Sequence, residues 1–369
     1  MIPATGTWAS RLPEFPWDTL IAAKETALAH PDGLVDLSVG TPVDRVAPAI
    51  RRALADAADW PGYPATYGTP GLRKAFCAWL DRTHGVSDLA EGAVLPTVGS
   101  KELVASLPFQ LGLGAGDIVG FPELAYPTYE VGALLAGCSV QRGSTPAHFA
   151  EATPKLLWIN SPSNPSGAVT SPEQLRHLVT WARSKGVILA SDECYIDMGW
   201  DVSPISILHR EISGGDHTNL LAVHSLSKRS NLAGYRVGFV SGDPSLVKSL
   251  LGIRKHMGAI VPGPIQAAAV AALDDDGHVL AQRSRYADRR AVLMEALGEA
   301  GFTIDHSEAG LYLWCTRGES SADTVDWLAE RGILVAPGTF YGPAGDRHVR
   351  VALTATDAKV AAAADRLTR

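Results

Sequence analysis

The feature that most constrains the fold is a series of short, uninterrupted apolar runs separated by segments with helical patterning. Continuous apolar runs, rather than alternating ones, are typical of parallel strands that are covered on both faces. Between the third and fourth runs, Ser171 and Gln174 form a capping-box pattern and Gly186 provides a helix stop. The pattern therefore predicts an α/β fold with strands at 93–98, 117–121, 155–160, 187–191, 220–224 and 235–240.

The rhythm of strand and helix predicts two domains. A large α/β domain, with a mostly parallel central sheet flanked by helices, is expected over residues 40–255. The sequence pattern changes after Pro264, where long helical segments precede a strand-rich stretch and a last helix. We expect residues 256–369 and 1–39 to form a smaller α+β domain together.

Charge and composition exclude several classes of protein. The 369 residues carry a net charge of −7, so the chain lacks the basic surface expected of a nucleic-acid binder. No apolar run approaches the roughly 18 residues that a membrane span needs, and the N-terminus lacks the apolar core of a signal peptide. The four cysteines lie far apart without a CxxC pair, so we expect no disulfide or zinc site and a location in the reducing cytoplasm.

Polar residues follow the predicted strands, and in open α/β sheets ligands bind at the carboxyl ends of the strands. The first run is followed by Gly99, Ser100 and Lys101, which open a helix whose free N–H groups could hold a phosphate. The third run leads to Asn164, which precedes a proline and is therefore held extended. Alone, the first would be read as an ordinary helix cap and the second as an ordinary turn.

The next two strand ends carry ionisable groups. Asp192 and Tyr195 follow the fourth run, where a buried carboxylate is costly unless it is paired or hydrogen-bonded. The fifth run is followed by a polar loop that contains Ser225, Ser227, Lys228 and Arg236.

The combination of these strand ends is far more specific than any one of them. A cofactor with a phosphate, a protonatable ring nitrogen, a phenolic oxygen and an aldehyde would use them all, and pyridoxal phosphate has these groups. A nucleotide hydrolase is the rival interpretation, because residues 187–193 resemble a Walker B strand. That rival lacks a GxxxxGK[ST] loop, and the glycine-rich segment 111–117 has Asp117 where GxGxxG needs its third glycine.

Three motifs, in this order, resemble those of the class I/II aminotransferases of pyridoxal-phosphate fold type I: NSPSNPSG at 160–167, DECY at 192–195 and SLSKRSNLAGYR at 225–236. The resemblance extends from Gly40 to Arg350, with NPSG in place of the commoner NPTG. It implies that Lys228 binds the cofactor aldehyde covalently and that Asp192 pairs with the ring nitrogen. It assigns the phenolic oxygen to Asn164 and Tyr195, and the phosphate to Ser100, Lys101 through its backbone, Ser225, Ser227 and Arg236.

The same resemblance assigns further contacts. Tyr126 would stack on the cofactor ring, and Arg350 would grip the substrate α-carboxylate with help from Asn164 and the backbone of Gly40. Tyr63 would reach the phosphate of a partner subunit, which implies a homodimer, although Tyr67 lies in the same loop.

In the expected reaction, three residues carry the chemistry. Lys228 would act as general base, and Asp192 would keep the ring nitrogen protonated because an opposite charge raises the pKa of a cation. Tyr195 would complete the catalytic group at the phenolic oxygen.

Within this family, segments 15–44, 99–108 and 122–137 look like those of N-succinyldiaminopimelate aminotransferases of lysine and diaminopimelate biosynthesis. That likeness implies L-glutamate as amino donor and N-succinyl-2-amino-6-oxopimelate as acceptor. Both are acidic, so a second cation is expected, with Arg254, Lys255 and His256 as candidates. The alternatives are an aspartate or broad-specificity aminotransferase, a C–S lyase, and a non-catalytic regulator of the same fold.

Overall fold

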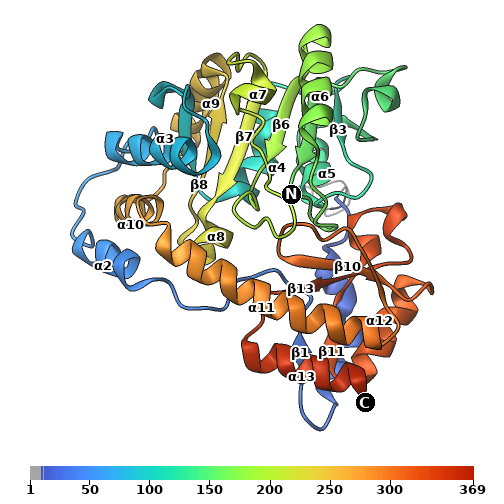
Figure 1. Ribbon diagram of the computed structural model, residues 1–369. Helices are drawn as coiled ribbons and strands as arrows, with labels where there is room; N and C mark the ends of the chain where they lie inside the picture. The colour runs from blue at the N-terminus through green and yellow to red at the C-terminus, as the bar shows by residue number, and fades with distance from the viewer. Residues whose placement is uncertain (1–9, 11) are drawn as a thin grey trace, which may run out of the picture.

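The computed structural model describes residue 10 and residues 12–369, and a seven-stranded sheet forms its centre (Figure 1). The strands lie in the order β2-β8-β7-β6-β5-β3-β4. Their bounds are β2 Val94–Thr97, β3 Ile118–Phe121, β4 Ser139–Arg142, β5 Leu156–Asn160, β6 Ile188–Asp192, β7 Leu220–Ser225 and β8 Gly238–Gly242.

The sheet confirms the predicted fold class. Strands β7, β6, β5, β3 and β4 run parallel, and β8 is antiparallel to both of its neighbours. Each of the six predicted runs contains a strand, but the last begins at Gly238 because residues 233–235 form a 3₁₀ turn. Strand β4 was not predicted, since its sequence SVQR is polar and lies half exposed at the edge of the sheet.

Helices cover both faces of this sheet. Alternate residues of β5 show the two faces, because Leu157 belongs to one hydrophobic cluster and Leu156 to another. The first cluster packs under α3 (Pro70–His84), α6 (Pro172–Lys185) and α10 (Gly263–Leu273), and the second under α4 (Ser100–Gln110), α5 (Thr128–Leu135) and α9 (Pro244–Met257).

The predicted capping box of α6 is confirmed. The Ser171 hydroxyl accepts from the Gln174 N–H at 3.2 Å, and the Gln174 side chain accepts from the Ser171 N–H at 3.0 Å. Gly186 ends the helix with φ of 65°, a left-handed conformation that favours glycine.

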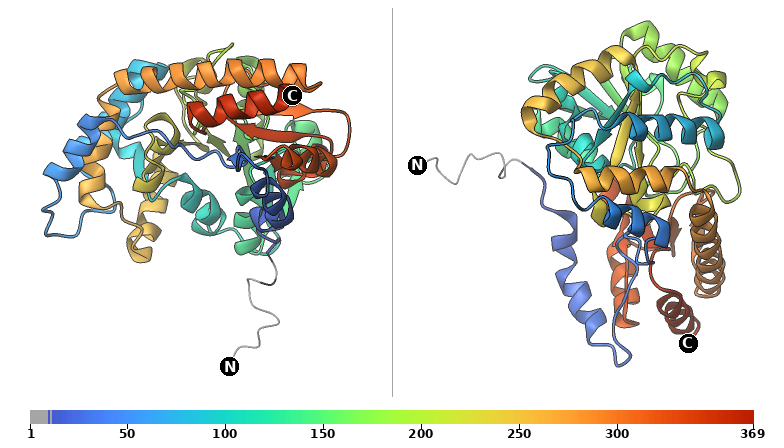
Figure 2. Two further views of the ribbon diagram at one scale, coloured as in Figure 1. Left: turned by 90° about the horizontal axis from the view of Figure 1, so that it is seen from below. Right: turned by 90° about the vertical axis from the view of Figure 1, so that its left-hand side faces the viewer.

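A second core lies below the large sheet. It is built on a four-stranded sheet in the order β12-β13-β10-β9 and on the parallel pair β1-β11, in which Val35 lies opposite Ile333. Helices α1 and α12 lie on one side of these strands, and α11 and α13 on the other (Figure 2). The bounds are α1 Ile21–Leu28, β1 Val35–Asp36, α11 Gly277–Glu299, β9 Thr303–Asp305, β10 Tyr312–Thr316, α12 Ser321–Glu330, β11 Ile333–Leu334, β12 Ala336–Pro337, β13 Val349–Ala352 and α13 Asp357–Thr368.

The expected domain boundary at residue 255 stays a prediction. Helix α10 lies beyond it, yet it packs on α3 and on α2 (Pro48–Asp56) within the core of the large sheet. The N-terminal segment joins the second core through β1. No helix in the described part of the chain is long and apolar enough to span a membrane.

Candidate active site

A cavity of about 520 Å³ lies at the carboxyl ends of β5, β6 and β7, between the large sheet and the smaller one. It also receives side chains from β10, β13 and the segment that holds Phe15 and Trp17. The predicted site residues that line it are Gly40, Ser100, Lys101, Tyr126, Asn164, Asp192, Tyr195, Ser225, Ser227, Lys228, Arg236 and Arg350.

Tyr63 is the predicted site residue that lies elsewhere. Its side chain is fully exposed and does not line the cavity of its own chain. Its expected contact is with a partner subunit, so this role stays a prediction.

One end of the cavity is built to hold an anion. Gly99 has φ of 77° directly before Ser100, where α4 begins and its first N–H groups are free of helical partners. A Cβ at Gly99 would collide with the guanidinium of Arg236, so only glycine lets that cation lie over the start of the helix. Arg236 donates to the Ala233 carbonyl at 2.9 Å and to the Val98 carbonyl at 3.5 Å, and a guanidinium with five N–H donors still has others for an anion such as phosphate.

Lys228 lies beside this anion site. It belongs to the short helix α8 (Leu226–Arg229), which Ser225 caps by accepting from the Ser227 N–H at 3.2 Å. The Lys228 Nζ donates to the carbonyl of Gly40. A Cβ at Gly40 would collide with the hydroxyl of Tyr312, so this close approach requires glycine.

Asp192 also lines the cavity; it terminates β6 and is 6% exposed. Its Oδ2 accepts from the hydroxyl of Tyr129 at 2.8 Å, and its Oδ1 accepts from the Cys194 N–H at 3.2 Å. Burial raises the pKa of Asp192, and the hydrogen bonds from Cys194 and Tyr129 oppose that rise. No lysine, arginine or histidine in the described residues forms an ion pair with Asp192, so a buried carboxylate here lacks a cation that a protonated ring nitrogen would supply.

Arg350 and Asn164 line the same cavity and are hydrogen-bonded to each other. Arg350 is 2% exposed and donates to Asn164 Oδ1 at 2.8 Å and to the Ser38 carbonyl at 2.6 Å. Because the Asn164 oxygen faces Arg350, its NH₂ group is left for an acceptor such as a phenolic oxygen. The guanidinium also lies over the Tyr312 ring, 3.9 Å from the centroid.

Three tyrosines surround this point. The hydroxyls of Tyr195 and Tyr312 are 2.9 Å apart. Burial raises the pKa of Tyr195 well above its usual value, and it raises that of Tyr126 to about 12. Burial also tends to raise the pKa of Tyr312, but the positive charges of Arg350 and Lys228 outweigh burial and bring this pKa below its ordinary value.

The donor set fits pyridoxal phosphate, because each polar group of that cofactor finds a complementary residue in one cavity. The comparison with known families decides the class: residues 32–367 match the family described as "Aminotransferase class I and II". The chain belongs to the class I and II aminotransferases. It is therefore a pyridoxal-phosphate-dependent aminotransferase with the type I fold.

Named relatives agree with this class. The aminotransferase is 61% identical to a probable aminotransferase of Mycobacterium tuberculosis, over 99% of this chain and 88% of that protein. It is 57% identical to the 4-dedimethylamino-4-oxo-anhydrotetracycline transaminase OxyQ of Streptomyces rimosus, over 97% and 99% of the two chains. Among solved structures, an aminotransferase of Neisseria meningitidis Z2491 superposes with a TM-score of 0.89 at 30% identity, covering 98% and 99% of the chains.

The structure adds residues that the sequence patterns did not single out. Tyr129 contacts Asp192 from α5, Tyr312 contacts Tyr195 from β10, and Phe15 and Trp17 line the cavity. The one available signal was the spacing of Tyr129, which lies one helical turn beyond Tyr126 and so on the same side of the chain. The others depend on tertiary packing between distant segments.

The candidates for a second substrate cation need correction. Arg254 is buried and holds Glu102 through two hydrogen bonds of 2.9 and 2.8 Å, so it is not free to bind a substrate. Lys255 and His256 are exposed on α9 and do not line the cavity. The alternative interpretation of this segment, a solvated helix face, fits Lys255 and His256.

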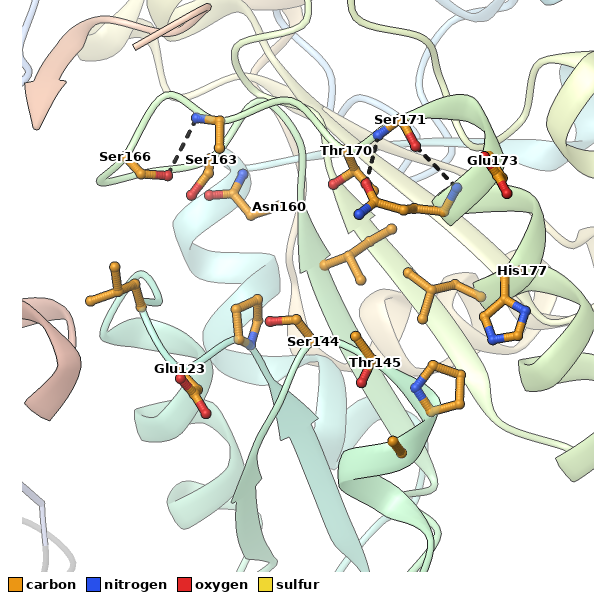
Figure 3. Close-up of a pocket in the computed structure, with 18 of the residues that line it drawn as sticks. Glu123, Ser144, Thr145, Asn160, Ser163, Ser166, Thr170, Ser171, Glu173 and His177 are labelled. Carbon is orange, nitrogen blue, oxygen red and sulfur yellow. Dashed lines mark hydrogen bonds between the residues drawn. The ribbon is translucent and has the colours of Figure 1, made fainter. Parts of the chain in front are cut away.

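A larger cavity, of about 1230 Å³, lies between the loop that follows β5, the first turns of α6 and the segments 122–124 and 144–147 (Figure 3). Asn160 lines both cavities, whereas the cofactor-site residues lie in the smaller one. Ser163, Ser166 and Ser171 face the larger cavity, and the Arg176 cation at its edge is paired with Glu211 at 2.9 Å. The smaller cavity, with its unpaired cations, is therefore the candidate active site.

Proposed function

We propose that this aminotransferase transfers the amino group of L-glutamate to N-succinyl-2-amino-6-oxopimelate, a reaction of lysine and diaminopimelate biosynthesis. The observation that carries the proposal is a surplus cation in the cavity. Arg236 suits the phosphate, Lys228 the aldehyde and Arg350 the α-carboxylate, which leaves the Lys101 side chain without an assigned partner. An acceptor with a distal carboxylate would use it.

The position of Lys101 supports this assignment. Its side chain lines the cavity, and no ion pair with it occurs among the described residues. Its Nζ lies 5.4 Å from the centre of the Phe15 ring. Burial lowers the pKa of Lys101, and the charge of Arg236 adds to this effect, so an incoming carboxylate would relieve both.

Substrate orientation would come from Arg350. A planar guanidinium can grip a carboxylate through two N–H groups, which a lysine cannot do. Its contacts to Asn164 and Ser38 fix the guanidinium plane before substrate arrives, so little ordering entropy is lost on binding. The half-exposed ring of Phe15 would then pack against the methylene groups of the succinyl chain.

When bound, pyridoxal phosphate supplies an electron sink for the substrate carbanion. Lys228 would carry the proton between the substrate Cα and the carbon of the cofactor aldehyde group, because its amine is in the cavity beside the aldehyde site. Asp192 would keep the ring nitrogen protonated by its negative charge. Asn164 and Tyr195 would donate hydrogen bonds to the phenolic oxygen.

We also propose a homodimer in which the exposed Tyr63 reaches the phosphate of the partner subunit. The four cysteines form no disulfide, which is compatible with a cytoplasmic enzyme.

A second candidate is transamination of a polycyclic ketone. The relative from Streptomyces rimosus is named for such an activity, and aromatic residues line the cavity here as well. A ketone of that kind has no α-carboxylate and would not need Arg350. Aspartate or broad-specificity transamination and C–S lysis remain the other outcomes of the test.

The test is a panel of half-reactions followed by a lysine substitution. After loading with glutamate, the enzyme should convert N-succinyl-2-amino-6-oxopimelate with a higher kcat/KM than oxaloacetate or pyruvate. Lys101→Met should then lower kcat/KM for the succinylated acceptor about 10- to 100-fold, the usual cost of losing a hydrogen bond to a charged group. It should leave pyruvate, which has no distal carboxylate, nearly unaffected.

Lys255→Met is the matched control, because Lys255 is exposed on α9 and outside the cavity. If oxaloacetate or a polycyclic ketone reacts faster than the succinylated acceptor, the substrate assignment is wrong. If Lys101→Met lowers kcat/KM equally for all acceptors, Lys101 does not bind the distal carboxylate.

A further inference from the structure

The Tyr312 hydroxyl occupies an unusual position for a side chain of the smaller sheet. Tyr312 is the first residue of β10 and is 3% exposed, and its hydroxyl lies 2.9 Å from that of Tyr195. The same hydroxyl fills the space that a Cβ of Gly40 would occupy, while the Gly40 carbonyl accepts from Lys228. Tyr312 is therefore held between the catalytic lysine and the tyrosine expected at the phenolic oxygen.

The direction of the hydrogen bond between the two tyrosines follows from counting protons. Each hydroxyl has one proton to donate and can also accept. If Tyr195 donates its proton to the phenolic oxygen of the cofactor, it has none left for Tyr312. Tyr312 must then be the donor of the pair.

We propose that Tyr312 is a positioning residue that acts through Tyr195: it donates a hydrogen bond to Tyr195 and so directs the Tyr195 proton to the phenolic oxygen of the cofactor. The inference rests on the role proposed above for Tyr195. It adds a second donor behind the first and makes the smaller sheet part of the cofactor's environment.

Such a chain of two hydroxyls has a measurable consequence. Hydrogen bonds in series polarise one another, so Tyr195 becomes a stronger donor when Tyr312 donates to it. A stronger donor stabilises the negatively charged form of the phenolic oxygen. The bound cofactor should therefore lose its titrating proton at a lower pH than it would without Tyr312.

The neighbours of Tyr312 also carry charge or can titrate, and they remain in place when only its hydroxyl is removed. Arg350 lies over its ring at 3.9 Å, and the other groups that act on it electrostatically come from α8, α11 and three further segments near β10. These groups are Lys228, Tyr195, Cys194, Tyr126, Tyr286 and Tyr341.

The experiment is a pH titration of the absorption spectrum of the cofactor-loaded, substrate-free enzyme. Tyr312→Phe removes the hydroxyl and keeps the ring, and it should raise the spectroscopic pKa by about half a unit to one unit. Tyr195→Phe should raise it more. In the Tyr195→Phe background, adding Tyr312→Phe should cause no further shift, because the effect passes through Tyr195.

Tyr341→Phe is the matched control. Tyr341 is buried, its ring lies 5.0 Å from the Arg350 guanidinium, and its hydroxyl has no hydrogen-bond partner among the described residues. This variant should titrate as the wild type does. Tyr312→Met, a second variant without the hydroxyl, should shift the pKa in the same direction as Tyr312→Phe.

Two results would overturn the proposal. One is a spectroscopic pKa in Tyr312→Phe equal to that of the wild type. The other is a pKa shift on Tyr312→Phe that is as large in the Tyr195→Phe background as in the wild type. Because no substrate is present, the result does not depend on which oxo-acid the enzyme accepts. Suppose that the pKa shifts as expected but the succinylated acceptor is not the preferred one in the half-reactions. The proposed substrate would then be wrong, and the proposed role of Tyr312 would still hold.

Discussion

The two walls of the active site differ in origin. The wall that we call the cofactor wall consists of Ser100, Asn164, Asp192, Lys228 and Arg236, which end a strand of the large sheet or lie in the segment that follows one. The substrate wall consists of Phe15, Trp17, Tyr312 and Arg350, which come from an N-terminal segment and from two strands of the smaller sheet.

The difference lies in what fixes each position. Parallel strands end at a common edge, so the backbone alone brings the cofactor wall together. In the substrate wall, Tyr312 and Arg350 meet because β10 and β13 pair in one antiparallel register, with Trp314 opposite Arg350. Substitutions in the first wall should therefore abolish chemistry. Substitutions of Phe15, Trp17 and Arg350 in the second wall should change affinity and selectivity, whereas those of Tyr312 should change the titration of the cofactor.

The largest expected effect belongs to the cofactor wall. Lys228→Ala removes the amine that we expect to bind the aldehyde and to move the proton, so kcat should fall by at least about 10⁴-fold. After borohydride reduction, mass spectrometry should find cofactor attached to the wild type and none attached to the variant. Lys248→Ala, at an exposed position on α9, is the control and should keep both properties.

An intermediate effect should come from Arg350→Lys in the substrate wall. A lysine keeps the charge but loses the two-point grip and the contacts to Asn164 and Ser38, so KM for glutamate should rise about 100-fold. Steady-state kinetics would measure this, with the exposed Arg347→Lys as control. An equal loss with an amine that has no α-carboxylate would show that Arg350 supports the fold rather than the substrate.

The smallest effect should come from Tyr129→Phe, behind the cofactor wall. Burial raises the pKa of Asp192 and Tyr129 counteracts the rise, so removing this donor should raise the pKa further. Asp192 is then protonated over a wider acidic range, and cofactor affinity should fall as the pH is lowered. We expect a loss of about 3- to 10-fold at pH 6, measured as the cofactor dissociation constant.

Tyr286→Phe is the control for that measurement, because Tyr286 is also a buried tyrosine but lies on α11. Equal cofactor affinity in Tyr129→Phe and wild type at every pH would mean that the Cys194 N–H alone is sufficient to hold Asp192.

The same comparison explains what the sequence could predict. Six strands of the large sheet lie in continuous apolar runs, and polar residues lie at or soon after the ends of several of them, so these strands and the candidate residues of the cofactor wall were predictable. Strand β4 was not, since an edge strand with polar side chains has no apolar signal. Two other contacts were not predictable either: Tyr312 with Tyr195, and Phe15 with Lys101. Each depends on packing between segments roughly 100 residues apart, and the hydrophobic periodicity of a sequence does not encode such packing.

The hydrogen bond between Arg350 and Asn164 joins the two walls at one amide group. Asn164 is expected to serve the cofactor with its nitrogen while its oxygen holds the arginine for the substrate. Two ligands that share one residue are thermodynamically linked, and the linkage is reciprocal. Occupancy of the cofactor site should therefore tighten the binding of a carboxylate at Arg350, and a bound carboxylate should tighten the binding of the cofactor by the same free energy.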